Sequence, residues 1–154
     1  MQKTNFFKEF VKYASLNVLG MLGLSCYILA DTFFVAQGLG TSGLAALNLA
    51  IPVYSFIHGS GLMLGMGGAT KYSIYKGKNL DSAADNVFSN TVYAAATISV
   101  IFALCGVFLS GALTSVLGAD AEVFDMTDTY MKTILLFSPA FMLDNVFICF
   151  VRNH

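Results

Sequence analysis

The sequence predicts an all-α membrane protein, a polytopic bundle of four transmembrane helices. Of its 154 residues, 56% are hydrophobic and only 11% are charged, whereas charged residues make up about 25% of soluble domains. Asp31 and His58 are the only ionisable acidic or basic residues between Tyr13 and Thr70, and none occurs from Asn86 to Ala119. Because a membrane-spanning helix needs about 20 apolar residues, stretches of this kind indicate a chain embedded in the lipid bilayer.

The four predicted spans nearly exhaust the chain. Glycine clusters mark turns, and a glycine-rich turn at residues 38–43 separates the first two spans. A polar loop at residues 71–85 separates the second from the third, and an acidic loop at residues 120–128 separates the third from the fourth. The predicted spans are residues 13–36, 44–70, 87–113 and 130–151.

The distribution of lysine and arginine predicts the orientation, because cytoplasmic loops are enriched in them. With four spans, seven of the eight Lys and Arg residues fall on one side of the membrane: three before the first span, three in the second loop, and Arg152. Lys132 alone falls on the other side. We therefore expect both ends of this segment in the cytoplasm, and the protein in the plasma membrane.

The composition also excludes several functions. A net charge of −1 without a basic cluster argues against nucleic acid as a partner. The three cysteines lie in apolar runs without CxxC spacing, so we expect neither disulfides nor a metal cluster. His58 and Ser60, two residues apart on a helix, point about 160° away from each other and cannot act as base and nucleophile. We expect no enzyme activity and no organic cofactor.

Span two contains two features that concern packing. Gly61 and Gly65 form a small-xxx-small pair, which lets two helices approach closely in lipid. Pro52 removes one backbone hydrogen bond, so we expect a kink or a broken turn there.

Asp31 is the first candidate for a functional role, because an ionisable side chain within a span usually faces a cavity or a partner. Asn17, Tyr27 and Asp31 lie on one face of the predicted helix, given its 3.6-residue period. This polar face predicts a titrating or cation-binding site. The alternative is an aspartate that only bonds a neighbouring helix.

Other polar residues in the spans are candidates for lining a cavity. Asn48 and Ser55 belong to a small, polar stripe of span two, and Asn48 is the expected partner of Asp31. Asp144, beside Asn145, is the second intramembrane acid, either a second relay group or a carboxylate that reaches water in an inward-facing cavity. The residues predicted to line a cavity are Asn17, Ser55, Asp144, Asn145 and Met63, the last as part of an adaptable apolar wall.

Four motifs along the chain resemble those of the multidrug and toxic compound extrusion (MATE) family. The acidic residue, Gly-x-x-Gly-like turn and Leu-Ala-Ala of the family's first span are similar to residues 30–47 here. Residues 67–70 and 75–77 resemble the second span and its cytoplasmic exit, and residues 117–131 the third external loop. The resemblance covers nearly the whole chain, in the family's order.

The resemblance implies a fold and a function. Family members have twelve helices in two six-helix lobes and export organic cations or other amphipathic compounds against an inward flow of Na⁺ or H⁺. Residues 1–154 would then be the N-terminal part of the first lobe, and the missing C-terminal helices would be its partners. Asp31 matches the acid of the family's N-lobe cation site, where it could hold Na⁺ with oxygens of Tyr27 and Asn48.

Two other functions remain open. A flippase of lipid-linked saccharides, from the same wider superfamily, should place several Arg or Lys residues in a central cavity, and the predicted spans contain none apart from Lys132 at the start of the fourth. A freestanding four-helix membrane scaffold without transport is the more distant alternative.

Overall fold

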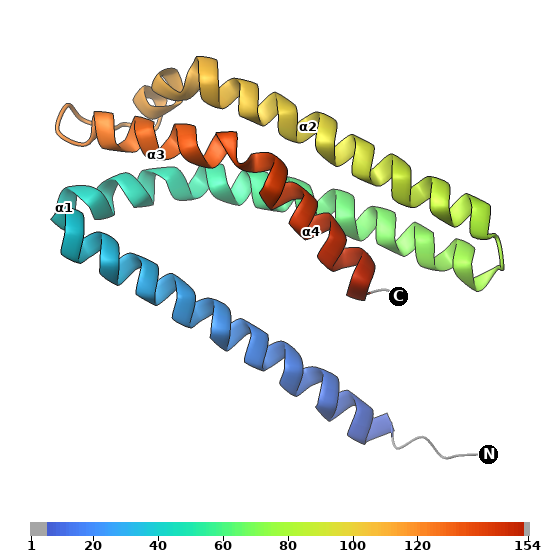
Figure 1. Ribbon diagram of the computed structural model, residues 1–154. Helices are drawn as coiled ribbons and strands as arrows, with labels where there is room; N and C mark the ends of the chain where they lie inside the picture. Colours follow the sequence, from blue (N-terminus) through green and yellow to red (C-terminus); the bar gives the residue numbers. More distant parts are fainter. Residues whose placement is uncertain (1–5, 153–154) are drawn as a thin grey trace. The chain divides into compact units, whose positions relative to one another are not determined.

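The regular structure of the chain is helical throughout the part that can be described. The computed structural model describes residues 6–152, apart from a few side chains near the start of the first helix. The helices are α1 (Phe6–Gly77), α2 (Asp81–Val116), α3 (Phe124–Leu136) and α4 (Ser138–Arg152), shown in Figure 1. The chain divides into two compact units between Leu44 and Ala45. The predicted all-α class is confirmed.

Two helical segments of the described residues are long and apolar enough to cross a membrane. They are Val18–Gly77, with 60 residues, and Asp81–Val116, with 36 residues, and the bent pair of α3 and α4 would make a third. At about 1.5 Å per residue, a helix of 60 residues measures about 90 Å, three times the thickness of the hydrocarbon layer. The length of α1 therefore requires an interruption.

That interruption lies at Gly40. Its φ of 66° and ψ of −151° are non-helical, and only glycine adopts this region without strain. The predicted glycine-rich turn is thus confirmed in position, but it is a break at one residue and not a loop. Of the kink or broken turn expected at Pro52, the broken turn is wrong, because the backbone keeps helical torsions there, and the kink stays a prediction. Proline is tolerated in transmembrane helices where neighbouring groups compensate for the lost hydrogen bond.

A tight turn joins α1 to α2 in the second unit. Asn79, with a φ of 57°, reverses the chain, and the Leu80 N–H donates to the Tyr75 carbonyl at 3.0 Å. Across the turn, Lys76 Nζ donates to Asp81 Oδ1 at 2.8 Å. The polar loop predicted at residues 71–85 is therefore mostly helical, and only residues 78–80 lie outside a helix.

The acidic loop is shorter than the predicted residues 120–128. Because α3 begins at Phe124, Asp125 and Asp128 lie on a helix and not in the predicted loop. Asp120 remains in the turn, where its Oδ1 accepts hydrogen bonds from the N–H groups of Glu122 and Val123, at 3.2 and 3.1 Å. These bonds fold the residues after Asp120 into a tight turn. Helix α3 therefore begins before the acidic stretch ends.

The predicted fourth span consists of two helices, α3 and α4, which meet at an angle of 47°. Pro139 explains the bend, because it lacks an N–H and its ring would clash with the carbonyl of the preceding turn. Proline fits instead in the first turn of a new helix, which is its place in α4. The hydroxyl of Ser138 donates to the Ser99 carbonyl at 3.0 Å and ties this new start to α2.

The second unit packs through small side chains, as the glycine pair predicted. A Cβ added to Gly61 would lie 3.2 Å from the Met142 Cα of α4, and one added to Gly65 would lie 3.1 Å from the Val146 Cα. Gly68 faces Thr91 of α2 in the same way. The buried residues of α2 are all small: Ala84, Ala95, Ser99, Gly106, Ser110 and Thr114.

Candidate functional site

The clearest polar contact between helices in the second unit joins His58 of α1 to Asn145 of α4. Asn145 Nδ2 lies 3.0 Å from His58 Nδ1 and also donates to the Phe141 carbonyl at 2.8 Å. Asn145 is buried, with 5% of its surface exposed, and His58 is half-buried. The two residues are 87 positions apart in the sequence, so packing of the helices creates this site.

The two contacts of the Asn145 amide bear on the tautomer of the His58 ring. A carbonyl oxygen only accepts, so the Asn145 atom beside the Phe141 carbonyl is the amide nitrogen. The second N–H of this nitrogen is then the donor toward His58. His58 Nδ1 therefore accepts, and the proton of a neutral imidazole lies on Nε2. A doubly protonated ring would place two donors face to face and break the contact.

Aromatic rings surround the pair. Tyr54, one turn before His58, stacks on its ring with centroids 5.9 Å apart and an interplanar angle of 22°. The same tyrosine meets Phe141 edge to face at 5.5 Å. Ser60 donates to the Phe56 carbonyl at 2.8 Å, so the serine and His58 are not paired, as the helical spacing predicted. The arrangement can hold a proton or a hydrogen-bonding ligand at the free edge of the imidazole.

The other predicted cavity residues of the second unit do not join this pair. Asp144 is exposed, on the face of α4 next to that of the buried Asn145. Asn48 and Ser55 are exposed on α1, and Met63 is 74% exposed. The structure thus brings one predicted residue, Asn145, into a defined polar contact, while the cavity roles of the others stay predictions.

Asp31 and Tyr27 belong to the first unit, on the part of α1 that precedes Gly40. Both are exposed, Tyr27 with 68% of its surface. The side chain of Asn17 lies outside the described residues. Among the residues described, no three His, Cys, Asp or Glu side chains come together as ligands for a metal ion. A Na⁺ site that joins Asp31 and Tyr27 to Asn48 of the second unit stays a prediction.

A second group of buried polar atoms lies where α3 packs against α2. Thr114 of α2 and Thr127 of α3 are fully buried, and neither hydroxyl has a hydrogen-bond partner among the described residues. The same holds for Asp128 Oδ1, which would lie 3.8 Å from a Cβ added to Gly111. A buried polar atom without a hydrogen bond lowers the stability of the folded state. These three side chains are therefore a second polar group of the unit, and they lack hydrogen-bond partners among the described residues.

The sequence predicts Asn145 as a cavity residue but not its partner His58, although an ionisable ring within an apolar run is itself a signal. It does not predict the second group. Asp128 was assigned to an aqueous loop because four acids lie close together there. Thr114 and Thr127 gave no signal, because threonine hydroxyls in helices usually bond to the carbonyl of the preceding turn, as Thr70 and Thr97 do here.

Comparison with known proteins gives one family. A model of the MatE family matches residues 17–154. The chain is 24% identical over 152 residues to the multidrug export protein MepA of Staphylococcus saprophyticus, which covers 99% of the chain and 34% of that protein. It is 25% identical over 142 residues to the MepA of Staphylococcus aureus strain MRSA252, with 92% and 32% covered. The chain therefore spans about a third of the length of these curated relatives. No solved structure gives a significant match.

Proposed function

The chain belongs to the MatE family, and we propose on that basis that it forms part of a secondary transporter that exports drugs or other organic compounds in exchange for Na⁺ or H⁺. The observation that carries the proposal is the family match over residues 17–154, together with the similarity to multidrug export proteins. The family consists of transporters and not of enzymes.

In this proposal the chain crosses the membrane four times, as part of a six-helix lobe. The break at Gly40 divides the 60-residue apolar segment of α1 into two crossings, because one crossing needs only about 20 residues. Helix α2 supplies the third. Helices α3 and α4, with 13 and 15 residues, are each too short to cross alone and together supply the fourth.

The proposed orientation places both ends of this segment in the cytoplasm, in the plasma membrane. It is supported by the clustering of basic residues toward one end of the second unit. Lys76 and Lys78 lie at the α1–α2 turn, and α4 ends at Arg152. Val151 and Tyr72 line the same pocket, which brings the end of α4 close to the last turns of α1.

Coupling to the ion gradient is assigned to Asp31. Its carboxylate and the Tyr27 hydroxyl lie one helical turn apart, and both side chains are exposed on the first unit, where they are accessible to an ion. A carboxylate that binds Na⁺ or H⁺ loses its charge, and a neutral helix face moves more easily against apolar neighbours. Asn48 would supply a third oxygen from the second unit.

The flippase alternative is not favoured by any observation. It needs basic side chains for an anionic headgroup, and no Lys or Arg occurs from Tyr13 to Thr70 or from Asn86 to Ala119. An exporter of organic cations needs no such residues. The scaffold alternative makes no use of Asp31, and the experiment on that residue separates it from transport.

Asp31→Asn tests the proposal in a protein that carries this segment together with the remaining helices of a transporter. The amide is nearly isosteric, so expression should be unchanged, while ethidium efflux from membrane vesicles under an imposed Na⁺ or H⁺ gradient should be abolished. Asp144→Asn serves as the matched control and should have a smaller effect. Wild-type efflux by the Asp31→Asn protein would show that this acid does not couple transport to the gradient.

A further inference from the structure

Helices α2 and α3 pack against each other along one register. They run antiparallel on either side of the turn at residues 117–123 (Figure 1), and a Cβ added to Gly106 of α2 would lie 2.5 Å from the Leu135 Cβ of α3. Residues four apart lie on one face of a helix. Two such steps from this contact toward the turn place Thr114 of α2 opposite Thr127 of α3, and both threonines are fully buried.

The two facing hydroxyls differ from those of other helical threonines. Thr70, Thr97 and Thr133 each donate to the carbonyl four residues earlier, at 2.7–2.8 Å, and such a bond satisfies the hydroxyl within its own helix. Neither Thr114 nor Thr127 makes this bond, or any other hydrogen bond among the described residues. Each of the two hydroxyls can therefore still donate one hydrogen bond at the interface of α2 and α3.

Asp128, next to Thr127 on α3, adds an acceptor at the same level of the helix pair. A Cβ added to Gly111 of α2 would lie 3.8 Å from Asp128 Oδ1, and Gly111 lies one turn before Thr114 on the same side of α2. Asp128 Oδ1 is buried and has no hydrogen-bond partner among the described residues. Two donors and one acceptor, from two helices, are thus gathered at one buried place.

Gly111 leaves space beside these polar atoms. The nearest atoms to a Cβ at that position would be Asp128 Oδ1 at 3.8 Å and Phe124 Cζ at 3.9 Å, so a group the size of a methyl fits there without a clash. At Gly106, by contrast, the contact of 2.5 Å with Leu135 leaves no such space. A small space inside a protein holds an ordered water molecule where polar groups line it and stays dry where they do not.

We propose that Thr114, Thr127 and Asp128 bind one buried water molecule between α2 and α3. The water accepts hydrogen bonds from the two threonine hydroxyls and donates one to Asp128 Oδ1. Three hydrogen bonds are the typical number for a buried water, and all three side chains are then satisfied. A metal cation suits these atoms less well, because it binds lone pairs and would leave both hydroxyl protons without acceptors.

The bound water ties the first half of the bent helix pair to α2 by polar bonds. Elsewhere the buried face of α2 carries small side chains, which allow close approach but make few directional contacts. The water therefore fixes the register of α3 against α2. The site requires neither transport nor Asp31, so the proposal stands or fails separately from the proposed function.

The experiment measures unfolding of the purified 154-residue chain in mixed micelles by circular dichroism. Thr127→Val keeps the shape of the side chain and removes one hydroxyl. If the water is bound, the ratio of folded to unfolded chain should fall by about threefold to tenfold, whereas loss of an unsatisfied hydroxyl would raise it. Thr97→Val is the matched control, because Thr97 is an exposed residue of α2 that bonds within its own helix.

Gly111→Ala separates a bound water from a direct bond between the threonines and Asp128. Alanine is the better helix former, so Gly67→Ala, with nothing within 4 Å of the new Cβ, should raise the folded ratio. Gly111→Ala should lower it, because the methyl displaces the water. A nuclear Overhauser effect between water and the Thr127 methyl group should be present in the wild-type chain and absent in Gly111→Ala, which keeps the hydroxyl.

Three results would overturn the proposal. The first is a Thr127→Val chain that is as stable as the wild type or more stable. The second is a Gly111→Ala chain that gains as much stability as Gly67→Ala or keeps the Overhauser effect. The third is a stabilisation by sodium chloride, relative to choline chloride at equal ionic strength, that Thr127→Val abolishes, since this would place a cation in the site.

Discussion

Helices α1 and α4 meet in two regions that differ sharply in character. At Gly61 and Gly65 the two backbones approach so closely that an added Cβ would lie 3.1–3.2 Å from Cα atoms of α4. Two turns beyond Gly65, Tyr72 and Phe150 hold the same helices apart, with ring centroids 5.5 Å apart. The first region is closed, and the second borders a cavity of about 530 Å³.

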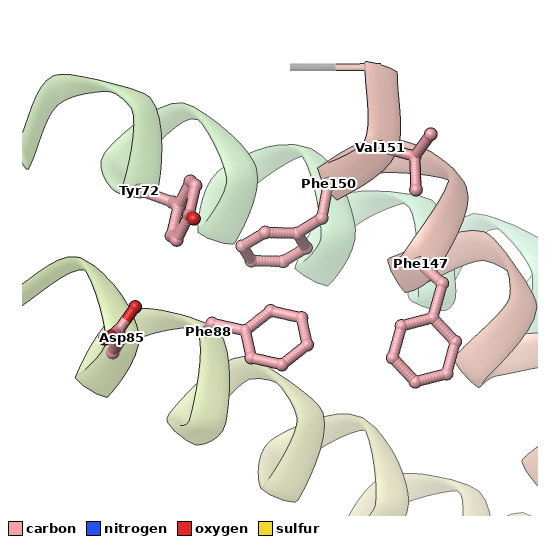
Figure 2. A pocket seen from close by; sticks show the side chains of 6 residues that line it. All are labelled: Tyr72, Asp85, Phe88, Phe147, Phe150 and Val151. Carbon is pink, nitrogen blue, oxygen red and sulfur yellow. The ribbon is translucent and has the colours of Figure 1, made fainter. Parts of the chain in front are cut away.

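The difference follows from side-chain size at successive contact positions. In lipid no hydrophobic force drives helices together, so close contact depends on small residues that allow backbones to pack. Rings at the next positions prevent that contact, because Tyr72 and Phe88 both meet Phe150 edge to face (Figure 2). One pair of helices thus provides both a close contact and part of the wall of an open cavity.

The largest expected effect comes from breaking the close contact. Gly65→Leu places a large side chain against Val146 and Cys149, and overpacking of this kind should lower the free energy of unfolding by about 3 kcal/mol. Gly67→Leu is the matched control, because nothing lies within 4 Å of a Cβ at that position. Unfolding of the purified chain in mixed micelles, followed by circular dichroism, measures both. Similar losses for the two variants would contradict a close contact at Gly65.

A medium effect is expected from the polar pair within the close contact. Asn145→Leu keeps the volume but removes both hydrogen bonds of the amide, which leaves His58 Nδ1 without its donor and should cost about 1–3 kcal/mol in the same unfolding assay. Nitrogen chemical shifts of His58 should change with the variant. Ser55→Ala, at an exposed position of α1, should change neither quantity. An unshifted His58 resonance in the leucine variant would show that the pair does not form.

The smallest effect concerns Lys76, beside the cavity. Its hydrogen bond to Asp81 raises the pKa of Lys76 above the ordinary value, so the side chain stays charged throughout the neutral range and loses its proton only at a higher pH than a free lysine. The stabilisation by this bond is present below the pKa of a free lysine and is lost as the pH rises through the raised pKa of Lys76. Lys76→Gln should therefore lower the unfolding midpoint slightly at neutral pH, and an unchanged midpoint there would show that the bond to Asp81 does not contribute.

The sequence predicted the features that depend on local chemistry. The helical class, the break among the glycines of residues 38–43 and the close approach at Gly61 and Gly65 all follow from residue types with a specific geometric effect. The bend before α4 was also within reach, because Pro139 interrupts the fourth apolar run as a helix breaker. The predicted bounds of the fourth span do not include this bend, because they rest on apolar length alone.

The contacts between distant residues could not be predicted. In a helix that is apolar on all sides, periodicity does not reveal which face packs against protein, so nothing in the sequence pairs His58 with Asn145 or Phe150 with Phe88. The same reason explains why the sequence does not distinguish Asp144 from Asn145 as cavity residues. Charge made the aspartate conspicuous, although its neighbour on the adjacent face is the residue that α1 covers.

The composition of the buried face of α2 also bears on the entropy of assembly. A side chain loses rotamer freedom when it is buried, by an amount close to zero for glycine and alanine and much larger for long side chains. The buried positions of α2 carry only glycine, alanine, serine and threonine, so their burial restricts few side-chain torsions. Large residues such as Ile98 and Phe102 pack half-buried against the core, whereas Ile101, Leu104 and Phe108 are exposed and keep their rotamer freedom on the outer surface of the helix.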